Sequence, residues 1–396
     1  MHGRRRFLRL LAGIAAGSTA FSLHAARPRP AIALFLCGDV MPGRAIDQIL
    51  PHPSNPTLHE PYMQDARGYL RLAEEASGDI PHPVPLDYIW GDALTELRRR
   101  QPAARIVNLE SSITRSNARW PKGINYRMHP DNVGCLTAAH LDCCALANNH
   151  VLDWQRAGLT ETLATLHHAR IATTGAGANL EAAQSPAILP IGDNTRVLVF
   201  AAATDDAGVP EEWAATASRS GVHRLPDLSR DTAMRIATLV RHHRRAGDRV
   251  VFSLHWGGNW GYAVSREQRA FAHALIDEAG VDIVHGHSSH HFKAIEVYRD
   301  RPILYGCGDF LNDYEGIEGN EEYRGELGLM YFPTLDAASG KLQKLELVPT
   351  LIRKFRVNYA GEEDRAWTLA RLQRECKAFG VEVDAGERGA FVVRWS

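Results

Sequence analysis

The stretch VDIVHGHSSH, residues 281–290, joins a short apolar run directly to three histidines. Short apolar segments bounded by glycine or polar residues are typical of buried strands. Four other apolar runs also end in aspartate, glutamate, asparagine or histidine: residues 32–37 before Gly38-Asp39, 105–107 before Asn108-Leu109-Glu110, 143–147 before Asn148-Asn149-His150, and 250–254 before His255-Trp256-Gly257. In open α/β sheets, ligands bind beyond the carboxyl ends of the strands. Five such endings, alternating with helical segments, predict an α/β fold with a single polynuclear metal site.

Length and charge limit the classes of protein to which the chain can belong. Its 396 residues suffice for one large domain or two average ones. Because 45 basic residues face 46 acidic ones, no charge excess indicates nucleic acid or an acidic membrane surface. We therefore expect no nucleic-acid partner.

Residues 1–26 are predicted to be a targeting segment that takes no part in the fold. Three arginines, Arg4-Arg5-Arg6, precede Phe7-Leu8, and an uncharged stretch rich in alanine, glycine and leucine follows to about residue 26. This pattern resembles a twin-arginine export signal, with an ordinary secretory signal or an uncleaved membrane anchor as alternatives. The prediction is an exported protein, periplasmic or otherwise extracytoplasmic.

The rest of the chain divides unequally. Residues 27–350 are expected to form one domain, and residues 351–396 a C-terminal appendage that packs on it. Helices are predicted at 86–100, 158–169, 228–245, 265–279 and 363–379, and strands at 171–174, 196–202, 294–299, 302–305, 327–332, 341–348 and 391–394. The segment 51–85, rich in proline and histidine, is predicted to be a long loop or a cap over the site. Most of the six cysteines fit small buried hydrophobes, and no disulfide pairing can be assigned.

The residue types at the strand ends indicate which metals to expect. Carboxylate, carboxamide and imidazole ligands together favour Zn, Mn or Fe over Ca or Mg. A bridging carboxylate can hold two ions about 3.5–4 Å apart, where they activate water jointly. The candidate ligands are Asp39, Glu110, Asn149, His255, His287 and His290. His150 is then left to protonate a leaving group. The expected cofactors are one or two divalent metal ions.

These motifs, together with GDVMPGR at 38–44, IEVY at 295–298 and PILYG at 302–306, are similar to the CapA family. That family of capsule (poly-γ-glutamate) biosynthesis proteins belongs to the calcineurin-like metallophosphoesterase superfamily, and the match covers about residues 31–315. The resemblance implies a four-layer α/β/β/α metallophosphatase-like sandwich with two mixed β-sheets. It also implies a division of the ligands: Asp39 and His290 for the first metal, Glu110 as the bridge, and Asn149, His255 and His287 for the second metal.

The chain departs from the superfamily pattern at several positions. Met41 stands where a ligand histidine usually follows the first aspartate, and the bridging residue is a glutamate. The last histidines are spaced His-x-x-His, which leaves His285 and His291 as alternative ligands. The turn GCGDF at 306–310 falls where the family usually has Gly-Asn-Phe, and no catalytic role is predicted for its Asp309.

Further candidates have both a functional and a structural interpretation. Arg44 could clamp a phosphate or carboxylate, or form a structural ion pair. Lys122, Tyr126 and Arg127 lie in a basic loop predicted to contact an anionic substrate. Asp153 could orient His150 or cap a helix.

The leading hypothesis is an exported CapA-type hydrolase that cleaves a phosphoester or an amide in a cell-envelope or capsular polymer. Its expected partners are an anionic polymer or phosphoester substrate and membrane-bound synthase or export subunits. The alternative is a non-catalytic subunit of such a complex, in which the metal is structural.

Overall fold

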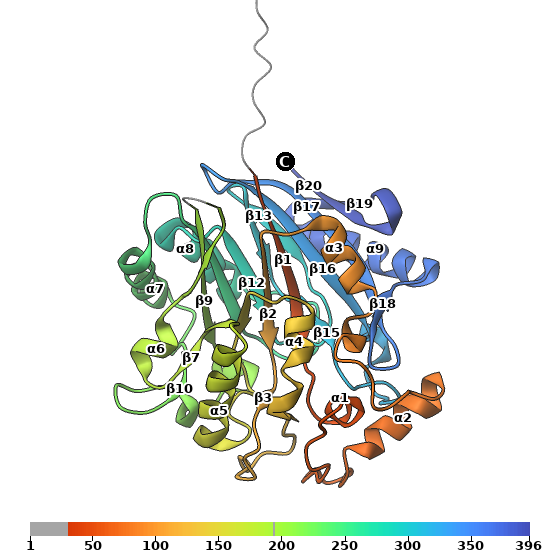
Figure 1. Ribbon diagram of the computed structural model, residues 1–396. Helices are drawn as coiled ribbons and strands as arrows, with labels where there is room; N and C mark the ends of the chain where they lie inside the picture. Colours follow the sequence, from red (N-terminus) through yellow and green to blue (C-terminus); the bar gives the residue numbers. More distant parts are fainter. Residues whose placement is uncertain (1–30, 193–194) are drawn as a thin grey trace, which may run out of the picture.

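The computed structural model describes residues 31–192 and 195–396. The predicted export segment, residues 1–26, lies outside them. Within the described ranges, no helix has the length and apolar character needed to cross a membrane. Figure 1 shows two β-sheets at the centre of the molecule, with helices on their outer faces.

The first sheet has ten strands and is mixed. Its central strands β1, β2, β5 and β6 are parallel, while β16 pairs antiparallel with β1 and leads on to β17, β20 and β19. The strands are β1 (Ala31–Val40), β2 (Ala104–Leu109), β5 (Cys143–Ala145), β6 (Ala172–Thr174), β15 (Asp309–Leu311), β16 (Leu327–Asp336), β17 (Leu342–Ile352), β18 (Val357–Tyr359), β19 (Val381–Ala385) and β20 (Phe391–Trp395).

The second sheet has six strands and is also mixed. Parallel strands β9, β11, β12 and β14 form its centre, and β8 and β13 pair antiparallel at its edges. The strands are β8 (Ala187–Pro190), β9 (Arg196–Ala203), β11 (Arg249–His255), β12 (Ile283–His287), β13 (Ile295–Tyr298) and β14 (Arg301–Leu304). Two short pairs complete the strands: β3 (Ser112–Ile113) with β4 (Arg127–Met128), and β7 (Ala176–Gly177) with β10 (Gly221–Val222).

Nine α-helices lie among the described residues: α1 (Ala45–Ile49), α2 (Arg67–Ser77), α3 (Ala93–Arg100), α4 (Gly134–Ala138), α5 (Gln155–His168), α6 (Leu180–Gln184), α7 (Arg230–His243), α8 (Arg266–Ala279) and α9 (Glu362–Cys376). Alternate residues of a strand face opposite sides of a sheet. Accordingly, Leu34 and Leu36 face a core shared with the second sheet, whereas Phe35 faces a core shared with α1 to α5. A third core joins the second sheet to α7 and α8. The four-layer α/β/β/α arrangement predicted from the sequence is confirmed.

Two local predictions were wrong. The segment 51–85 is not one long loop, because it contains the helix α2, whose Tyr69, Leu70 and Ala73 are buried at helical spacing. The helix predicted at 86–100 is interrupted, because Gly91 adopts a φ of 44° between a short 3₁₀ turn and α3. The helix predicted from Ser265 is confirmed, with Ser265 and Gln268 forming a capping box.

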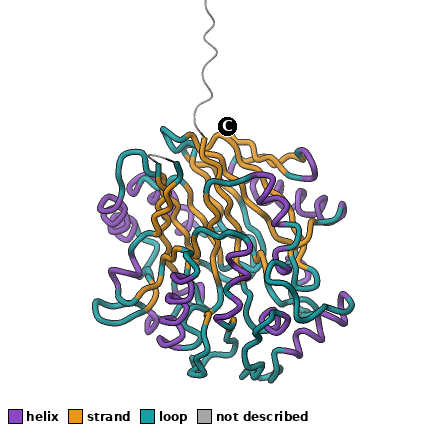
Figure 2. The backbone as a smooth tube through the Cα atoms, in the orientation of Figure 1, coloured by secondary structure: helices purple, strands orange, loops and turns teal. Residues whose placement is uncertain are grey.

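The C-terminal residues continue the first sheet. The predicted domain boundary at residue 350 falls inside β17, and β20 pairs with β17 so that β19 becomes the sheet edge. All six cysteines are buried free thiols, with no disulfide among them. Figure 2 shows the loops that follow β1 and β2 gathered below the sheets, at the carboxyl ends of these strands.

Candidate metal centre

Strand register brings the predicted ligands to one place. Asp39 on β1 lies beside Asn108 on β2, and His255 on β11 lies beside His287 on β12. Gly38 permits the close approach of the chain after β14, since a Cβ there would lie 1.7 Å from the Gly308 carbonyl oxygen. The two sheets therefore meet at the ends of their parallel strands.

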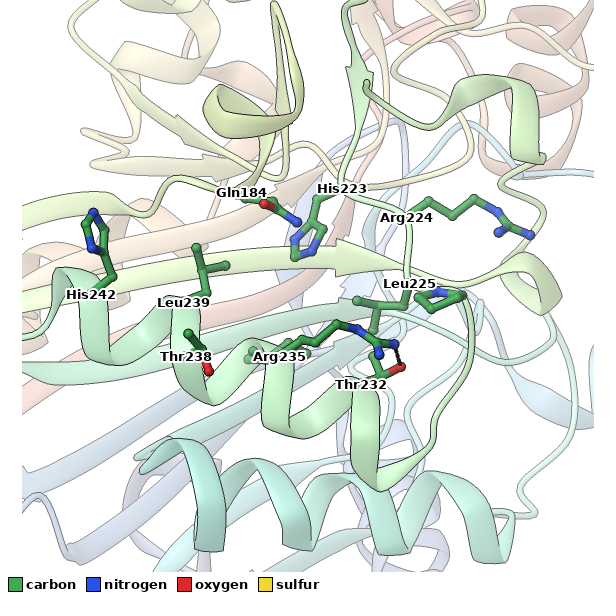
Figure 3. A pocket seen from close by; sticks show the side chains of 11 residues that line it. Gln184, His223, Arg224, Leu225, Thr232, Arg235, Thr238, Leu239 and His242 are labelled. Carbon is green, nitrogen blue, oxygen red and sulfur yellow. Dashed lines mark hydrogen bonds between the residues drawn. The ribbon is translucent and has the colours of Figure 1, made fainter. Parts of the chain in front are cut away.

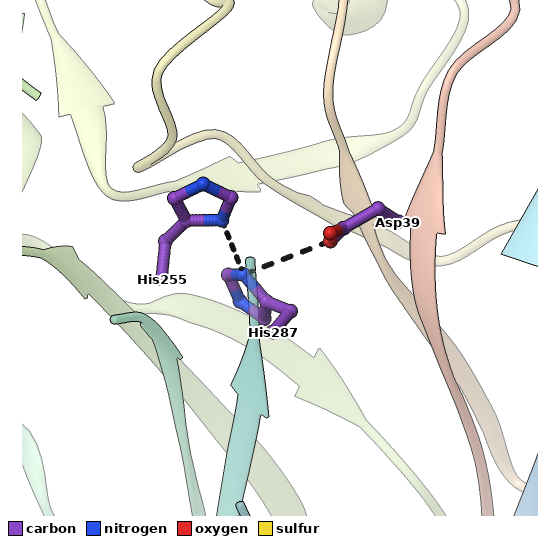
Figure 4. Close-up of side chains that lie close together, drawn as sticks. All are labelled: Asp39, His255 and His287. Atoms are coloured by element: carbon purple, nitrogen blue, oxygen red, sulfur yellow. Dashed lines mark hydrogen bonds and ion pairs between the residues drawn. The ribbon is translucent and has the colours of Figure 1, made fainter. Parts of the chain in front are cut away.

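Asp39, His255 and His287 form the centre of the site (Figure 4). Each offers one ligand atom, and these atoms lie within 4.8 Å of one another, on side chains that are almost fully buried. The Nδ1 atoms of the two histidines are 2.9 Å apart, and His287 Nδ1 is 3.8 Å from Asp39 Oδ1. These are mixed nitrogen and oxygen donors of the kind that Zn, Mn and Fe accept.

A relay of hydrogen bonds sets the tautomer of His287. His285 Nε2 donates to the Cys37 carbonyl at 2.7 Å, so its Nδ1 accepts from the Ser253 hydroxyl at 3.3 Å. Ser253 Oγ then accepts from His287 Nε2 at 2.7 Å. The lone pair of His287 is thereby left on Nδ1, which faces Asp39. His285 supports a ligand and is not free to be one.

The same logic separates His290 from His291. Both ring nitrogens of His291 are used by backbone groups, with Nδ1 donating to the Phe292 carbonyl and Nε2 accepting from Gly261 N–H. His290 instead donates Nδ1–H to Asp309 at 3.0 Å, which leaves its Nε2 as a lone pair. Of the two, only His290 can offer a nitrogen to a metal.

Glu110 is joined to Asp39 through Asn108. The Asn108 amide donates to Asp39 Oδ1 at 2.7 Å and to Glu110 Oε2 at 3.3 Å. Burial, reinforced by Asp309, raises the pKa of Asp39 to about 7, and burial beside Asp39 raises the pKa of Glu110 well above its usual range. Neither carboxylate has an arginine or lysine ion-pair partner among the described residues. A divalent cation would balance such a pair.

The imidazoles shift in the opposite direction. Burial lowers the pKa of both His255 and His287 well below the ordinary value, and neighbouring His150 and His290 add to the effect at His255. Burial would also lower the pKa of His290, but the Asp309 carboxylate outweighs it and the net shift is upward. His255 and His287 are therefore held in the neutral form that binds metals.

Asn149 also tests whether the residues fit a metal ion. Its Oδ1 is buried and accepts no hydrogen bond from any described residue, although a buried amide oxygen normally has a partner. A divalent cation would satisfy it. The donor set thus fits the metal ions that the residue types indicate.

His150 lies beside these ligands and carries its own support. Its Nδ1 donates to Asp153 Oδ2 at 2.7 Å, and its Nε2 lies 3.8 Å from Glu110 Oε1. Lys122 Nζ is 2.6 Å from Asp153 Oδ1 and also donates to the Asn149 carbonyl. Burial lowers the pKa of His150 to about 4, with Asp153 opposing this shift and Lys122 adding to it. Asp153 therefore orients the imidazole.

Arg44 requires a correction. Its guanidinium makes two bonds to Asp313, at 2.8 and 2.6 Å, a third to Glu60 at 3.2 Å, and lies over the Tyr69 ring. All of these groups are buried. Because its donors are already used, Arg44 forms a structural ion pair and is not placed to clamp a substrate anion.

The predicted substrate loop is corrected in part. Arg127 donates to the carbonyls of Ser116 and Asn55, and its guanidinium lies 4.0 Å from the centre of the Trp154 ring. Tyr126 is fully buried, with its ring 4.6 Å from that of His150. Both side chains are buried and engaged in contacts within the protein, which is the structural interpretation. Lys122, whose side chain is 25% exposed, is the member of the loop that borders the site.

Sequence reasoning missed four residues that hold the site together: Asn108, Ser253, His285 in its supporting role, and Asp309. Asn108 belongs to the motif Asn108-Leu109-Glu110. Its position two residues before Glu110 at the end of a strand could have indicated that both side chains lie on the same face. Ser288 is a further feature, since its φ of 99° is unusual for a residue with a side chain. Its N–H donates to Asp39 Oδ2 at 3.2 Å, so backbone strain is located at the site itself.

A surface cavity of about 480 Å³ lies elsewhere (Figure 3). It is bordered by α7 and by residues such as Gln184, His223 and Arg235, and it contains none of the predicted site residues. It is separate from the metal centre.

Two mixed sheets that bring carboxylates and imidazoles together at their strand ends define a layered α/β protein with a metal-type site. The chain belongs to the bacterial capsule synthesis protein family PGA_cap, whose model matches residues 33–314. The predicted resemblance to CapA proteins is confirmed.

The chain is similar in sequence to several named proteins. A probable polyglutamine synthesis accessory protein of Mycobacterium tuberculosis (strain H37Rv) is 48% identical over 354 residues, or 89% of this chain and 93% of that protein. The capsule biosynthesis protein CapA of Bacillus anthracis is 24% identical, over 72% of this chain and 61% of that protein. The PGA biosynthesis protein CapA of Bacillus subtilis is 27% identical, over 70% and 62%. A solved phosphatase structure from Mycoplasma pneumoniae aligns with 82% of this chain and 95% of its own, at 12% identity and a TM-score of 0.44.

Proposed function

We propose that the protein is a metal-dependent hydrolase that cleaves a phosphoester or an amide bond in a cell-envelope or capsular polymer, such as poly-γ-glutamate. The observation that carries this proposal is His150. It lies beside a buried set of metal-type ligands, and Asp153 holds its Nδ1 while its Nε2 lies 3.8 Å from Glu110. A purely structural metal site has no need of a free imidazole beside it.

The residues that would hold metal are Asp39, Glu110, Asn149, His255, His287 and His290. When bound there, divalent ions supply Lewis acidity, which lowers the pKa of water and stabilises negative charge on the reacting phosphoryl or carbonyl group. The chain contributes the geometry. The relay from the Cys37 carbonyl fixes His287, and Asn108 fixes the two carboxylates.

His150 would transfer the proton. In the free site it is neutral, with Nδ1–H donated to Asp153 and a lone pair on Nε2. An anionic substrate beside Nε2 favours the imidazolium, and the Asp153 carboxylate stabilises that form. The protonated Nε2 then gives its proton to the leaving oxygen or nitrogen. Lys122 contacts Asp153 and keeps that carboxylate in place.

The setting is proposed from the N-terminal segment and from the relatives. A twin-arginine export signal would place the enzyme outside the cytoplasm. Relatives named as accessory or biosynthesis proteins for polyglutamine, capsule and PGA suggest work beside membrane-bound synthase or export subunits.

The test is hydrolysis of aryl phosphomonoesters, aryl phosphodiesters and γ-glutamyl peptides by the chain loaded with Mn²⁺ or Zn²⁺. His150→Ala should keep its metal and lose activity by about 10²–10⁴-fold, the usual contribution of general acid–base catalysis. His223→Asn is the matched control, because His223 is equally buried, has a similarly lowered pKa, and lies outside the centre. Equal activity in His150→Ala and wild type would contradict the role of His150.

The depth of the site favours one second candidate, a non-catalytic metal-containing subunit of a polymer synthesis or export complex. Asp39, Glu110, His255 and His287 are at most 1% exposed, and two predicted substrate arginines are used in structural contacts. Full metal content without turnover of any of the three substrate classes would favour this candidate.

A further inference from the structure

Asp309 is a third buried carboxylate at the metal centre. It begins β15, which pairs in parallel with β1 so that Asp309 is the register partner of Asp39. Both side chains are fully buried, and Asp309 also acts electrostatically on Glu110. Among the described residues, no arginine or lysine forms an ion pair with any of these three acids. The centre therefore contains three acidic side chains, one more than the two carboxylates predicted to bind metal.

The contacts of Asp309 lead to one metal ligand. Its two oxygens lie 3.0 and 3.2 Å from His290 Nδ1, and the Asn312 amide donates to its Oδ2 at 2.6 Å. A carboxylate that accepts from one ring nitrogen fixes the ring and raises the basicity of the other nitrogen. Asp309 therefore orients the His290 ring and makes its Nε2 a stronger ligand for a metal ion.

Met41, the residue that departs from the superfamily pattern, also contacts β15. Met41 stands where a ligand histidine is usual, it is fully buried, and its N–H donates to the Leu311 carbonyl of β15. A thioether is a poor ligand for hard divalent ions. The strand that faces Met41 is the one that carries Asp309. The methionine directly after β1 thus contacts the strand that carries the third carboxylate.

We propose that Asp309 is the positioning residue of the first metal position. It holds His290 Nε2 toward the site and supplies the negative charge that lets a second divalent ion bind without a histidine at residue 41. This inference rests on the proposed function only in that metal binds at this centre, and it does not depend on which bond is cleaved.

The experiment measures metal stoichiometry and affinity by chelator competition and elemental analysis, with Mn²⁺ as the probe and the full chain as the protein. Asp309→Asn keeps an oxygen acceptor for His290 but removes the charge. Asp309→Ala removes both. Asp248→Asn is the control, since Asp248 is a buried carboxylate paired with Arg196 away from the site.

Wild type should bind two equivalents. Both Asp309 variants should weaken one equivalent by about 10–100-fold, the usual effect of losing an outer partner of a metal ligand, and leave the other unchanged. Their gain in melting temperature on adding Mn²⁺ should shrink accordingly. Asp248→Asn should bind like wild type.

Two equivalents with unchanged affinity in both Asp309 variants would overturn the inference, as would a wild type that binds a single ion. The proposed function fails separately. If wild type binds two ions and the variants lose one, but no substrate is hydrolysed, then the role of Asp309 stands and the hydrolase does not.

Discussion

At the end of the first sheet, burial raises the pKa of Asp39 and Glu110, whereas at the end of the second sheet it lowers the pKa of His255 and His287. The shifts are opposite, but their cause is the same, because burial disfavours the charged form of any group. The imidazoles are thereby set in the form that binds metal. The carboxylates are shifted toward the protonated form, and a bound cation would favour the ionised form that binds it. The ligands from the second sheet are therefore already in the protonation state that binds metal, whereas those from the first sheet are not.

The largest expected effect comes from removing one ligand on either side. Asp39→Ala and His287→Ala should each weaken Mn²⁺ binding by more than the roughly 100-fold that loss of an outer partner causes. Equilibrium dialysis measures this. If either variant bound Mn²⁺ with wild-type affinity, the metal ligands would come from one sheet alone, and the comparison between the two sheets would fail.

The substitution Arg44→Met tests the carboxylate side of the comparison, because it shows whether the arginine that follows β1 is structural. Leaving Asp313 and Glu60 buried without their partner should lower the free energy of unfolding by about 3–5 kcal/mol. Urea denaturation gives the value. The double variant Arg44→Met/Asp313→Leu should be less destabilised, because it leaves fewer unpaired charges. A stable Arg44→Met protein with reduced substrate binding would instead restore the clamp hypothesis.

His223 provides a reference imidazole outside the centre. Burial lowers its folded pKa to about 4, and its Nδ1 donates to the Ala201 carbonyl at 3.0 Å. Below its ordinary pKa of 6.5 the unfolded chain binds the proton more readily, so stability falls as the pH drops from 6.5 to 4. This loss reaches about 3 kcal/mol at most. His223→Asn should remove it, as urea midpoints at pH 7 and pH 5 would show. An unchanged pH dependence would contradict the shift.

The substitution Ser253→Ala tests whether the hydrogen-bond relay to His287 contributes to metal binding. Without the hydroxyl that accepts from His287 Nε2, the ring loses its fixed tautomer, and Mn²⁺ affinity should fall by about tenfold. Ser289→Ala is the control, since its buried hydroxyl donates to the His291 carbonyl outside the relay. Isothermal titration compares the two variants. Equal losses would mean that the relay has no special part in metal binding.

The strand ends were predictable because each apolar run and its polar ending are local in sequence. Asp39, His255 and His287 follow from that pattern together with the parallel arrangement of strands. The choice of His287 and His290 over the alternatives His285 and His291 could not be settled from the sequence, because it depends on hydrogen bonds made by groups distant in the chain, such as those to Cys37 and Asp309.

The arginines were misjudged for the same reason. A buried ion pair between Arg44 and Asp313 joins residues 269 positions apart, and no local pattern shows it. The helix α2 was also missed, because the prolines and histidines around it hid a short apolar face at helical spacing.

The most direct test is anomalous diffraction from crystals of the chain grown with Mn²⁺. The account predicts anomalous peaks at the junction of the two sheets, each bounded by ligands from both, with Asp39, His255 and His287 around one of them. Metal peaks confined to other parts of the molecule, with these three side chains free of metal, would contradict it.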